Sequence, residues 1–410
     1  MEIRPILSAL LRNKTGPILV ALQVALSLAI LANALHIVSE RREVAARPSG
    51  LLDEAATFHI TVRNLNKDSP EQMLANIGRE LDVLRAVPGV ASVAQVSQMP
   101  MSQSGGTSSV AADFRQQNPS GFASTYFTGN SIIETFGLKL VEGRDFAPHE
   151  IPDFNETAQG QPPSLIIVTR ALADRLWPGA SALGKPLYFG TGDGAQFARV
   201  IGVVETLIGA HAQVGADGQY AMIMPARQYG LRGAMYAIRA EPGQRERVMQ
   251  EAERALRAAS ATPMILRIKT VEEDRTNRYR ADMALSWMLV AVSILLLLVT
   301  CSGIVGMASL WVTQRRKQIG VRRALGARRT DILRYFILEN VLITSGGVLG
   351  GVLLGVGLNQ LLVRELSMSR LPVVYLVAGA LMFWALGILA ACGPAWRAAS
   401  ISPALATRSA

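Results

Sequence analysis

Four long apolar runs limit what this sequence can fold into. They extend over residues 16–37, 284–312, 336–363 and 372–395. Each run reaches or exceeds the roughly 20 helical residues that cross the hydrocarbon core of a bilayer. We therefore predict a membrane protein with one span near the start of the chain and three in its last third. The mostly polar residues 39–283 between the first two spans are predicted to form a large domain outside the bilayer.

Basic residues cluster on one side of the predicted spans. Arg4, Arg12 and Lys14 precede the first span, eight basic residues from Arg315 to Arg334 link the second and third, and Arg397 and Arg408 follow the fourth. Cytoplasmic loops carry an excess of Lys and Arg. This pattern predicts cytoplasmic segments at 1–15, 313–334 and 397–410. Residues 39–283 and a short loop at 364–371 then lie across the membrane, in the periplasm or outside the cell. The spans are predicted at 16–38, 284–312, 335–363 and 372–396.

The basic character of the chain resides outside the large polar domain. Of 41 basic and 31 acidic residues, the segment 39–283 holds 26 basic and 27 acidic, which leaves 15 basic and 4 acidic for the remainder. Cytoplasmic loops beside anionic lipid headgroups account for such a surplus. The charge therefore points to the bilayer and gives no indication of a nucleic-acid partner.

The first apolar run has a second interpretation, a cleaved signal sequence. A basic segment precedes it, and Ala32-Asn33-Ala34 is similar to a cleavage site. At about 22 residues the run is long enough to span, and we favour an intact helix. Both cysteines, Cys301 and Cys392, fall inside predicted spans. No disulfide framework is therefore expected in the large domain.

The large domain has the pattern of a mixed α/β fold. Residues 57–62 and 90–96 alternate like strands, and Ser69-Pro70-Glu71-Gln72 starts a helix between them with a capping box. The same order recurs as strand 234–240, helix 244–259 and strand 263–268. Two such units predict a split βαβ, porter-like lobe in which both units share one sheet. We predict a second, mixed α/β lobe inserted at about 126–224, with mobile loops at 102–109 and 150–163.

No catalytic or metal site is predicted. Residues 179–185 spell Gly-x-x-x-x-Gly-Lys, but Pro186 follows where a P-loop needs Ser or Thr, and 168–177 has a helical pattern where a strand is required. The glycines are therefore expected to form a turn. The four histidines, His36, His59, His149 and His211, are too dispersed for a metal site, and no serine stands in a nucleophile elbow. We predict a chain that is not an enzyme.

The predicted spans carry small residues and one carboxylate. Glu339 lies near the cytoplasmic edge of the third span, where Arg334 or Arg315 is its expected partner. Stripes of small residues let helices approach closely. They are Ala21, Ala25 and Ala29 in the first span and Gly346, Gly347, Gly350, Gly351 and Gly355 in the third. Packing within one subunit and a seam between two subunits both remain open.

The cytoplasmic link predicts a short amphipathic helix. Val321 and Leu325 fall on one helical face among basic residues, and Ile332 and Phe336 are expected to continue that face into the third span. A helix of this kind is also typical of a connector that lies on the lipid surface.

The link also resembles a known motif. The run Arg-Arg-Lys-Gln-Ile-Gly-Val-Arg-Arg-Ala-Leu-Gly-Ala at 315–327 is similar to the coupling helix of the FtsX-like permeases of ABC transporters, which include the MacB-type exporters. Residues 333–341 and 393–399, with Ser402-Pro403, resemble later parts of that family. Tyr126-Phe127, Gly137, 142–146 and 176–187 resemble the MacB-type periplasmic core.

The resemblance implies partners and a mechanism. It implies a dimer with a second permease copy or paralogue, and a separate ABC ATPase subunit that binds ATP and Mg, with no cofactor in this chain. Only 15 residues precede Gly16, so the ATPase fused in MacB is not expected here. The implied ATPase-coupling residues are Lys317, Gln318, Ile319, Gly320, Val321, Arg322, Arg323, Leu325, Gly326 and Ala327. Gln318 departs from the Glu that is common in the family.

The implied work is mechanotransmission, in which ATP-driven motion of the coupling helix shifts the periplasmic domain through stalks at 37–47 and 271–283. Ile319, Val321 and Leu325 are expected to insert into a groove on the ATPase. The resemblance favours export of a peptide, antibiotic or other small molecule in a tripartite pump with a periplasmic adaptor and an outer-membrane channel. Two alternatives remain: an FtsX-like regulator of a cell-wall hydrolase and LolC-like lipoprotein extraction.

Overall fold

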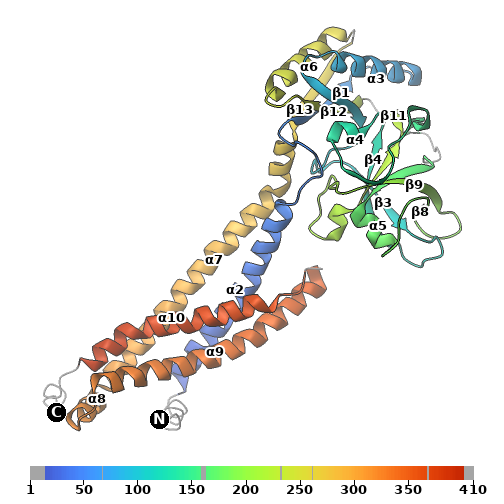
Figure 1. Ribbon diagram of the computed structural model, residues 1–410. Helices are drawn as coiled ribbons and strands as arrows, with labels where there is room; N and C mark the ends of the chain where they lie inside the picture. The colour runs from blue at the N-terminus through green and yellow to red at the C-terminus, as the bar shows by residue number, and fades with distance from the viewer. Residues whose placement is uncertain are drawn as a thin grey trace. The chain divides into compact units, whose positions relative to one another are not determined.

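The computed structural model describes residues 14–66, 68–157, 163–230, 233–260, 262–366 and 369–400. Contacts divide the chain into two compact units, Met1–Glu43 with Asp282–Ala410, and Val44–Ala281. We call them the helical unit and the α/β unit (Figure 1). The predictions that concern Arg4, Arg12, Arg408 and Ser402-Pro403 lie outside the described residues.

Each predicted span coincides with one long helix, except that Pro372, the first residue of the fourth span, precedes its helix. The helices are α2 (Thr15–Ala45), α7 (Val271–Gln314), α9 (Arg329–Leu366) and α10 (Val373–Ala399), with the short α8 (Arg316–Ala324) between α7 and α9. All four long helices have the length and apolarity needed to cross a membrane. The predicted arrangement of one span followed by three is confirmed. Both α2 and α7 continue past their apolar runs, and each has residues in both units.

The small residues of α2 and α9 pack against each other within the chain. A Cβ built on Gly347 would lie 2.8 Å from the carbonyl oxygen of Ala21, and one on Gly351 would lie 3.0 Å from that of Ala25. On Gly355 it would lie 3.5 Å from the Cα of Ala29. Gly350 also faces Ala25, at 3.4 Å, whereas a Cβ on Gly346 would meet nothing within 4 Å. Packing within one chain therefore accounts for these stripes, Gly346 excepted.

The two βαβ units of the α/β unit share one sheet, as predicted. They comprise β1 (Thr57–Asn64), α3 (Pro70–Arg85) and β2 (Val90–Val96), then β12 (Gly233–Ala240), α6 (Arg245–Ala259) and β13 (Met264–Thr270). The strand order is β2-β12-β1-β13, with every neighbouring pair antiparallel. Alternate residues of the central strands, such as Phe58, Ile60 and Tyr236, are fully buried in a core with apolar residues of α3 and α6. This is the predicted split βαβ lobe.

The capping box predicted for α3 is present. The backbone N–H of Gln72 donates to Oγ of Ser69 at 3.3 Å, and the Gln72 side chain accepts the N–H of Ser69 at 2.8 Å. Pro70 occupies the first turn, where its missing N–H costs nothing. Gly89, at a φ of +89°, follows the helix and turns the chain into β2.

Six strands in the rest of the α/β unit form a closed ring. The elements of this part are β3 (Gly106–Ala111), β4 (Gly121–Thr128), α4 (Ile132–Phe136), β5 (Leu140–Gly143), β6 (Asp153–Asn155), β7 (Leu165–Thr169), α5 (Arg170–Leu176), β8 (Pro186–Phe189), β9 (Gln196–Val204), β10 (Ala221–Pro225) and β11 (Arg227–Tyr229). Outside the ring, β5 pairs with β9, and β6 pairs with β11 in a separate sheet. The order β10-β7-β9-β8-β3-β4 closes because β4 also pairs with β10. Residues from these strands, such as Ile166 and Met222, are fully buried in one core.

Three details differ from the prediction for this lobe. Its strands begin at Gly106, before the expected start at 126. The expected mobile loop 102–109 is in part strand β3, and β6 in the loop 150–163 pairs with β11. Residues 158–162 lie outside the described residues. The lobe also shares a sheet with the split βαβ lobe, since Val96 of β2 pairs with Thr128 of β4.

Candidate functional site

Helix α8 begins where the chain breaks away from α7. Arg315, the residue between them, has φ −98° and ψ 12°. Ile319 is the buried apolar side chain of α8, at 5% exposure. It packs in one cluster with Ile332 and Phe336 of α9 and with three alanines of α10, Ala395, Ala398 and Ala399. The buried face of α8 therefore rests on the chain's own helices.

This burial corrects the expectation for Ile319. Ile319 cannot insert into a partner groove while it fills the chain's own core, and Ile332 and Phe336 continue its face, not the face of Val321 and Leu325. Sequence spacing missed this because Ala395 and Ala398 lie about 75 residues further along the chain. Val321 and Leu325 are exposed, at 52% and 82%. They remain the apolar groups that α8 presents outward.

An ion pair fixes the start of α8 to α9. Nη1 of Arg315 lies 2.9 and 3.0 Å from the two carboxylate oxygens of Glu339, which is 1% exposed. The guanidinium also lies over the ring of Trp311, with a separation of 5.9 Å. Of the two expected partners of Glu339, the structure brings Arg315 and not Arg334 into contact. Removing one member of a buried ion pair leaves an uncompensated charge, which is strongly destabilising.

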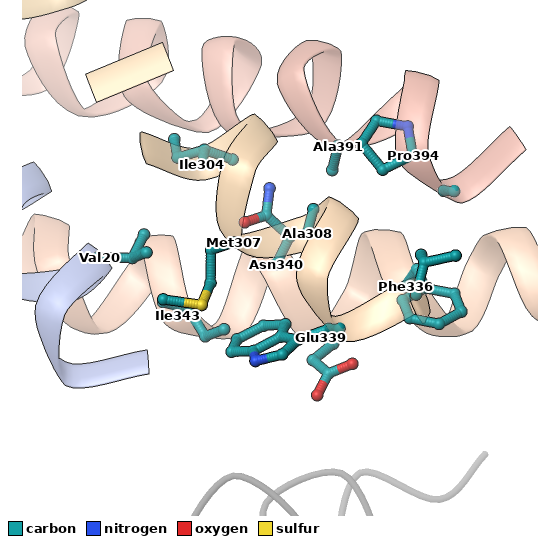
Figure 2. Close-up of a pocket in the computed structure, with 13 residues that line it drawn as sticks. Val20, Ile304, Met307, Ala308, Phe336, Glu339, Asn340, Ile343, Ala391 and Pro394 are labelled. Carbon is teal, nitrogen blue, oxygen red and sulfur yellow. The ribbon is translucent and has the colours of Figure 1, made fainter. Parts of the chain in front are cut away.

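A small cavity lies beside this ion pair, among helices α2, α7, α9 and α10 (Figure 2). Its volume of about 20 Å³ has room for about one water molecule. Glu339 and Asn340 contribute its polar groups, and Met307, Phe336 and Pro394 are among its apolar ones. Asn340 donates a hydrogen bond to the carbonyl of Gly387 in α10. The cavity is too small for a molecule larger than water.

The exposed side of α8 is strongly basic. Residues 316–334 hold seven basic residues against one acidic residue, Asp331. Arg316, Lys317 and Arg322 of α8 are exposed, and the guanidinium of Arg322 lies 5.1 Å from the ring centre of Tyr335. The face of α8 away from the core is therefore an apolar pair, Val321 and Leu325, surrounded by positive charge.

The C-terminus of α8 has the hydrogen bonds of a Schellman motif. The N–H of Gly326 donates to the carbonyl of Arg323, and the N–H of Ala327 donates to that of Arg322. Gly326 adopts a φ of +97°, a conformation that favours glycine. This turn ends α8 at Ala324 and leaves the side chain of Leu325, the C-cap residue, exposed.

The ten predicted coupling residues divide by exposure. Lys317, Gln318, Val321, Arg322, Leu325 and Gly326 are exposed, Arg323 and Ala327 are half-buried, and Ile319 and Gly320 are buried. Gln318 lines a shallow pocket with Arg315, Ile319 and Arg322. The structure brings these residues together on one short helix and its C-terminal turn.

Sequence analysis missed the uncharged polar contacts between the membrane helices. Oγ of Ser27 in α2 lies 2.8 Å from Oγ1 of Thr300 in α7. Asn33 donates to the carbonyl of Gly355 in α9 at 3.1 Å. Small polar residues inside apolar runs are the signal that could have indicated such contacts. Each contact joins two spans, so these groups hold the helices together.

The other candidate motifs have structural explanations. The P-loop-like glycines Gly179 and Gly184 follow helix α5 and precede strand β8, with φ of +72° and +75°. A P-loop has the reverse order, a strand followed by a helix, so the predicted turn is confirmed. His59 bonds to Asp274 at 2.8 Å and His36 to Ser369 at 2.9 Å. Within the described ranges, no group of three or more His, Cys, Asp or Glu could hold a metal ion.

Comparisons with known proteins match nearly the whole described chain. The family model described as MacB-like periplasmic core domain matches residues 24–255, and the model described as FtsX-like permease C-terminal matches residues 290–403. The chain is 28% identical over 306 residues to a Bacillus subtilis protein named uncharacterized ABC transporter permease YvrN, a match that covers 70% of each chain.

Longer relatives also match this chain. The macrolide export ATP-binding/permease protein MacB of Acinetobacter baylyi is 26% identical over 293 residues, which is 68% of this chain and 41% of the relative. The chain thus spans less than half the length of that protein. The crystal structure of the periplasmic region of MacB from Actinobacillus actinomycetemcomitans matches 57% of this chain and 97% of that chain, at 13% identity and a TM-score of 0.34.

Proposed function

The chain belongs to the FtsX-like ABC transporter permeases that carry a MacB-like periplasmic core domain, and we propose that it docks a separate ATPase through helix α8. Members of this family are membrane permeases, and an ATPase partner and a dimer are general to it. The four apolar helices and the periplasmic core fit an inner-membrane protein with a periplasmic domain. We propose that the ATPase binds ATP and Mg and that this chain holds no cofactor.

One observation carries this proposal. Helix α8 is held on one side by the buried Ile319 and by the Arg315–Glu339 ion pair, and presents Val321 and Leu325 on the other. Protein interfaces commonly have a few apolar anchor residues at the centre and a polar, charged rim around them. The anchor residues provide most of the binding energy. A lipid-surface connector needs the apolar face but does not need the attachment to α9.

Motion at α8 has a route into the membrane helices. Arg315 connects the start of α8 to α9 through Glu339, and it directly follows the last residue of α7. Helix α7 has 44 residues, so its length is about 66 Å, roughly twice the hydrocarbon thickness of a bilayer. We propose that ATP-driven displacement of α8 is transmitted along α7 and α2, the two helices that reach residues of the α/β unit.

The proposed topology follows from the same assignment. Residues 1–15, 313–334 and 397–410 are cytoplasmic, and residues 39–283 and 364–371 are periplasmic. The exposed basic side chains of α8 support this orientation, because cytoplasmic loops concentrate Lys and Arg.

We further propose that the transporter exports a peptide, antibiotic or other small molecule. The MacB relatives are named for macrolide export, and this chain shares their periplasmic core and permease models. A periplasmic adaptor and an outer-membrane channel are the proposed further partners. Within the four predicted spans, Glu339 is the one Asp, Glu, Lys or Arg residue. No chain of charges therefore crosses the bilayer, which favours work done by the periplasmic domain over a solute path between the spans.

Capture of the ATPase tests the docking proposal. Detergent-solubilised permease with Leu325→Ala should recover less ATPase than the parent and should stimulate ATP hydrolysis less. Leu65→Ala is a matched control, because Leu65 is also an exposed leucine but lies in the α/β unit. Equal recovery and equal stimulated rates for Leu325→Ala and the parent would leave α8 as a lipid connector.

A further inference from the structure

A cleft of about 430 Å³ lies in the α/β unit, where the split βαβ lobe meets the strand ring. Its lining comes from the ends of β1 and β2, the starts of β12 and β3, and from β4 and β11. Val96, whose pairing with Thr128 joins β2 to β4, is among the lining residues. The volume falls within the range of about 300–1,000 Å³ that is typical of small-molecule sites.

One wall of the cleft carries a buried amide without a full set of partners. Gln95 is 4% exposed, and its Nε2 donates to the carbonyl of Gln228 at 2.7 Å. Its Oε1 has no hydrogen-bond partner among the residues that the structure describes. Buried polar atoms are normally paired, because leaving one unpaired costs free energy. That oxygen is shielded from solvent and lies beside Gly129, on which a Cβ would lie 2.7 Å from it. The amide therefore shapes the wall through its bond to Gln228 and offers no acceptor to a ligand.

Two opposite charges also line the cleft. Arg63 lies near the end of β1 and Glu156 directly follows β6. Neither side chain makes an ion pair within the described part of the chain, although both face the same space. Glu156 is exposed to solvent in the cleft, and partial desolvation raises the pKa of its carboxyl. The cleft thus offers one cationic and one anionic group to a ligand.

Part of the remaining lining is apolar or aromatic. Val96, Phe127, Tyr229 and Met235 border the cleft, and Phe127 is itself stacked on Phe154 with ring centres 5.8 Å apart and planes 8° apart. Stacking fixes the ring of Phe127, so this wall is formed before a ligand arrives. Apolar walls with a few fixed polar groups are characteristic of ligand sites.

We propose that this cleft binds a small zwitterion with an apolar body, such as a short peptide with free termini. Its ammonium group would meet Glu156, its carboxylate Arg63, and its apolar side chains Phe127 and Met235. The proposal deepens the proposed export function by naming a binding site in the periplasmic domain and the charge pattern of its ligand.

Calorimetric titration of the purified full chain in detergent tests the proposal, with no ATPase present. The probes are trileucine, N-acetyl-trileucine, which lacks the ammonium group, and trileucine amide, which lacks the carboxylate. Hydrogen bonds to charged groups have a net value that corresponds to about tenfold in affinity or more. Trileucine should therefore bind about tenfold or more tightly than either capped peptide.

Two variants assign the charges. Glu156→Gln should remove the preference for the free ammonium group alone, and Arg63→Gln the preference for the free carboxylate alone. Arg199→Gln and Glu205→Gln are matched controls. Arg199 lies on β9 and Glu205 directly follows it, and both are exposed charged residues outside the cleft. They should keep both preferences.

Equal affinity for the three probes, no binding of trileucine at millimolar concentration, or unchanged preferences in both variants would overturn the assignment. Failure here leaves the docking of an ATPase on α8 untouched, because titration involves no ATPase. Failure of the capture experiment with Leu325→Ala would likewise leave the cleft intact.

Discussion

Arg315, at the start of α8, forms an ion pair with Glu339, a carboxylate that is buried between the membrane helices. The two residues are 24 positions apart, and Glu339 is 1% exposed. The carboxylate would lack a counter-charge if Arg315 moved. The position of α8 and the packing around Glu339 are therefore linked.

Glu339→Gln should weaken this link. The amide cannot balance the guanidinium charge, and breaking a buried ion pair costs about 3–5 kcal/mol in soluble proteins. We expect a lower melting temperature in detergent and a lower ATPase rate in the assembled complex. Glu365→Gln, which removes an exposed carboxylate near the end of α9, is the control. The double variant Arg315→Glu with Glu339→Arg should recover part of the melting temperature and part of the ATPase rate. A Glu339→Gln protein with the stability and the ATPase rate of the parent would refute the link.

Ile319→Ala should reduce the stability of the fold, whereas Leu325→Ala should reduce binding of the ATPase. Ile319 is in the core, so its truncation should cost about 2–5 kcal/mol of stability. Leu325 is 82% exposed, so its truncation should leave the melting temperature unchanged and reduce ATPase capture. Thermal melting and capture measured on the same two proteins would separate the roles. A destabilised Leu325→Ala with normal capture would reverse the assignment.

Gly351→Val and Gly346→Val should differ in stability. A Cβ on Gly351 would lie 2.9 Å from Leu28, whereas one on Gly346 would meet nothing within 4 Å. We expect Gly351→Val to lower the melting temperature of the helical unit and Gly346→Val to leave it unchanged. Light scattering on Gly346→Val measures whether the protein is still a dimer. A monomer with a normal melting temperature would assign Gly346 to a seam between two permease copies.

Glu80 predicts a pH dependence of the split βαβ lobe. Burial raises the pKa of Glu80 above the ordinary value of a glutamate, and the hydroxyl of Tyr236, which donates to the carboxylate at 2.6 Å, opposes the shift only in part. The folded state therefore holds the proton more tightly than the unfolded state. Stability should rise as pH falls from 7 through the raised pKa, and the rise should end near the unfolded pKa.

Glu80→Gln should abolish this part of the pH dependence. Hydrogen exchange of the segments that contain α3 and β12, measured between pH 5 and 7 and corrected for intrinsic rates, gives the readout. Glu150 offers a contrast, because hydrogen bonds from Arg144 and from the backbone N–H of Ala147 lower its pKa to about 2. Its contribution to the stability of the fold is therefore lost only as pH falls from about 4.5 through 2. Parent-like protection in Glu80→Gln at every pH would contradict the assignment.

Single-cysteine labelling tests the topology. In a background without Cys301 and Cys392, a cysteine at Ser104 should react with an impermeant reagent added to the periplasmic side, and one at Ser409 should not. Reaction of both from the same side, or a mature N-terminus at Leu35, would contradict the proposed orientation and the intact first span.

Local patterns predicted what depends on neighbours in the sequence. The cap at Ser69, the helix up to Arg85 and the four spans are decided by residues within a few turns of each other, and all are present. The closure of the strand ring depends on the pairing of β4 with β10, about 100 residues apart, which no local pattern encodes. The burial of Ile319 is of the same kind, because helical spacing shows which residues share a face but not which face is covered.

The hydrogen bond from Asn33 to Gly355 has a consequence for biosynthesis. The two residues are 322 positions apart, and ribosomes add roughly 5–20 residues per second. For about 16 to 64 seconds after α2 is made, its amide and its alanine stripe face lipid without their partner helix. During that interval the nascent first span is exposed to membrane quality control. Substitutions on α9, such as Gly351→Val, would prolong the exposure and so reduce the amount of permease that accumulates.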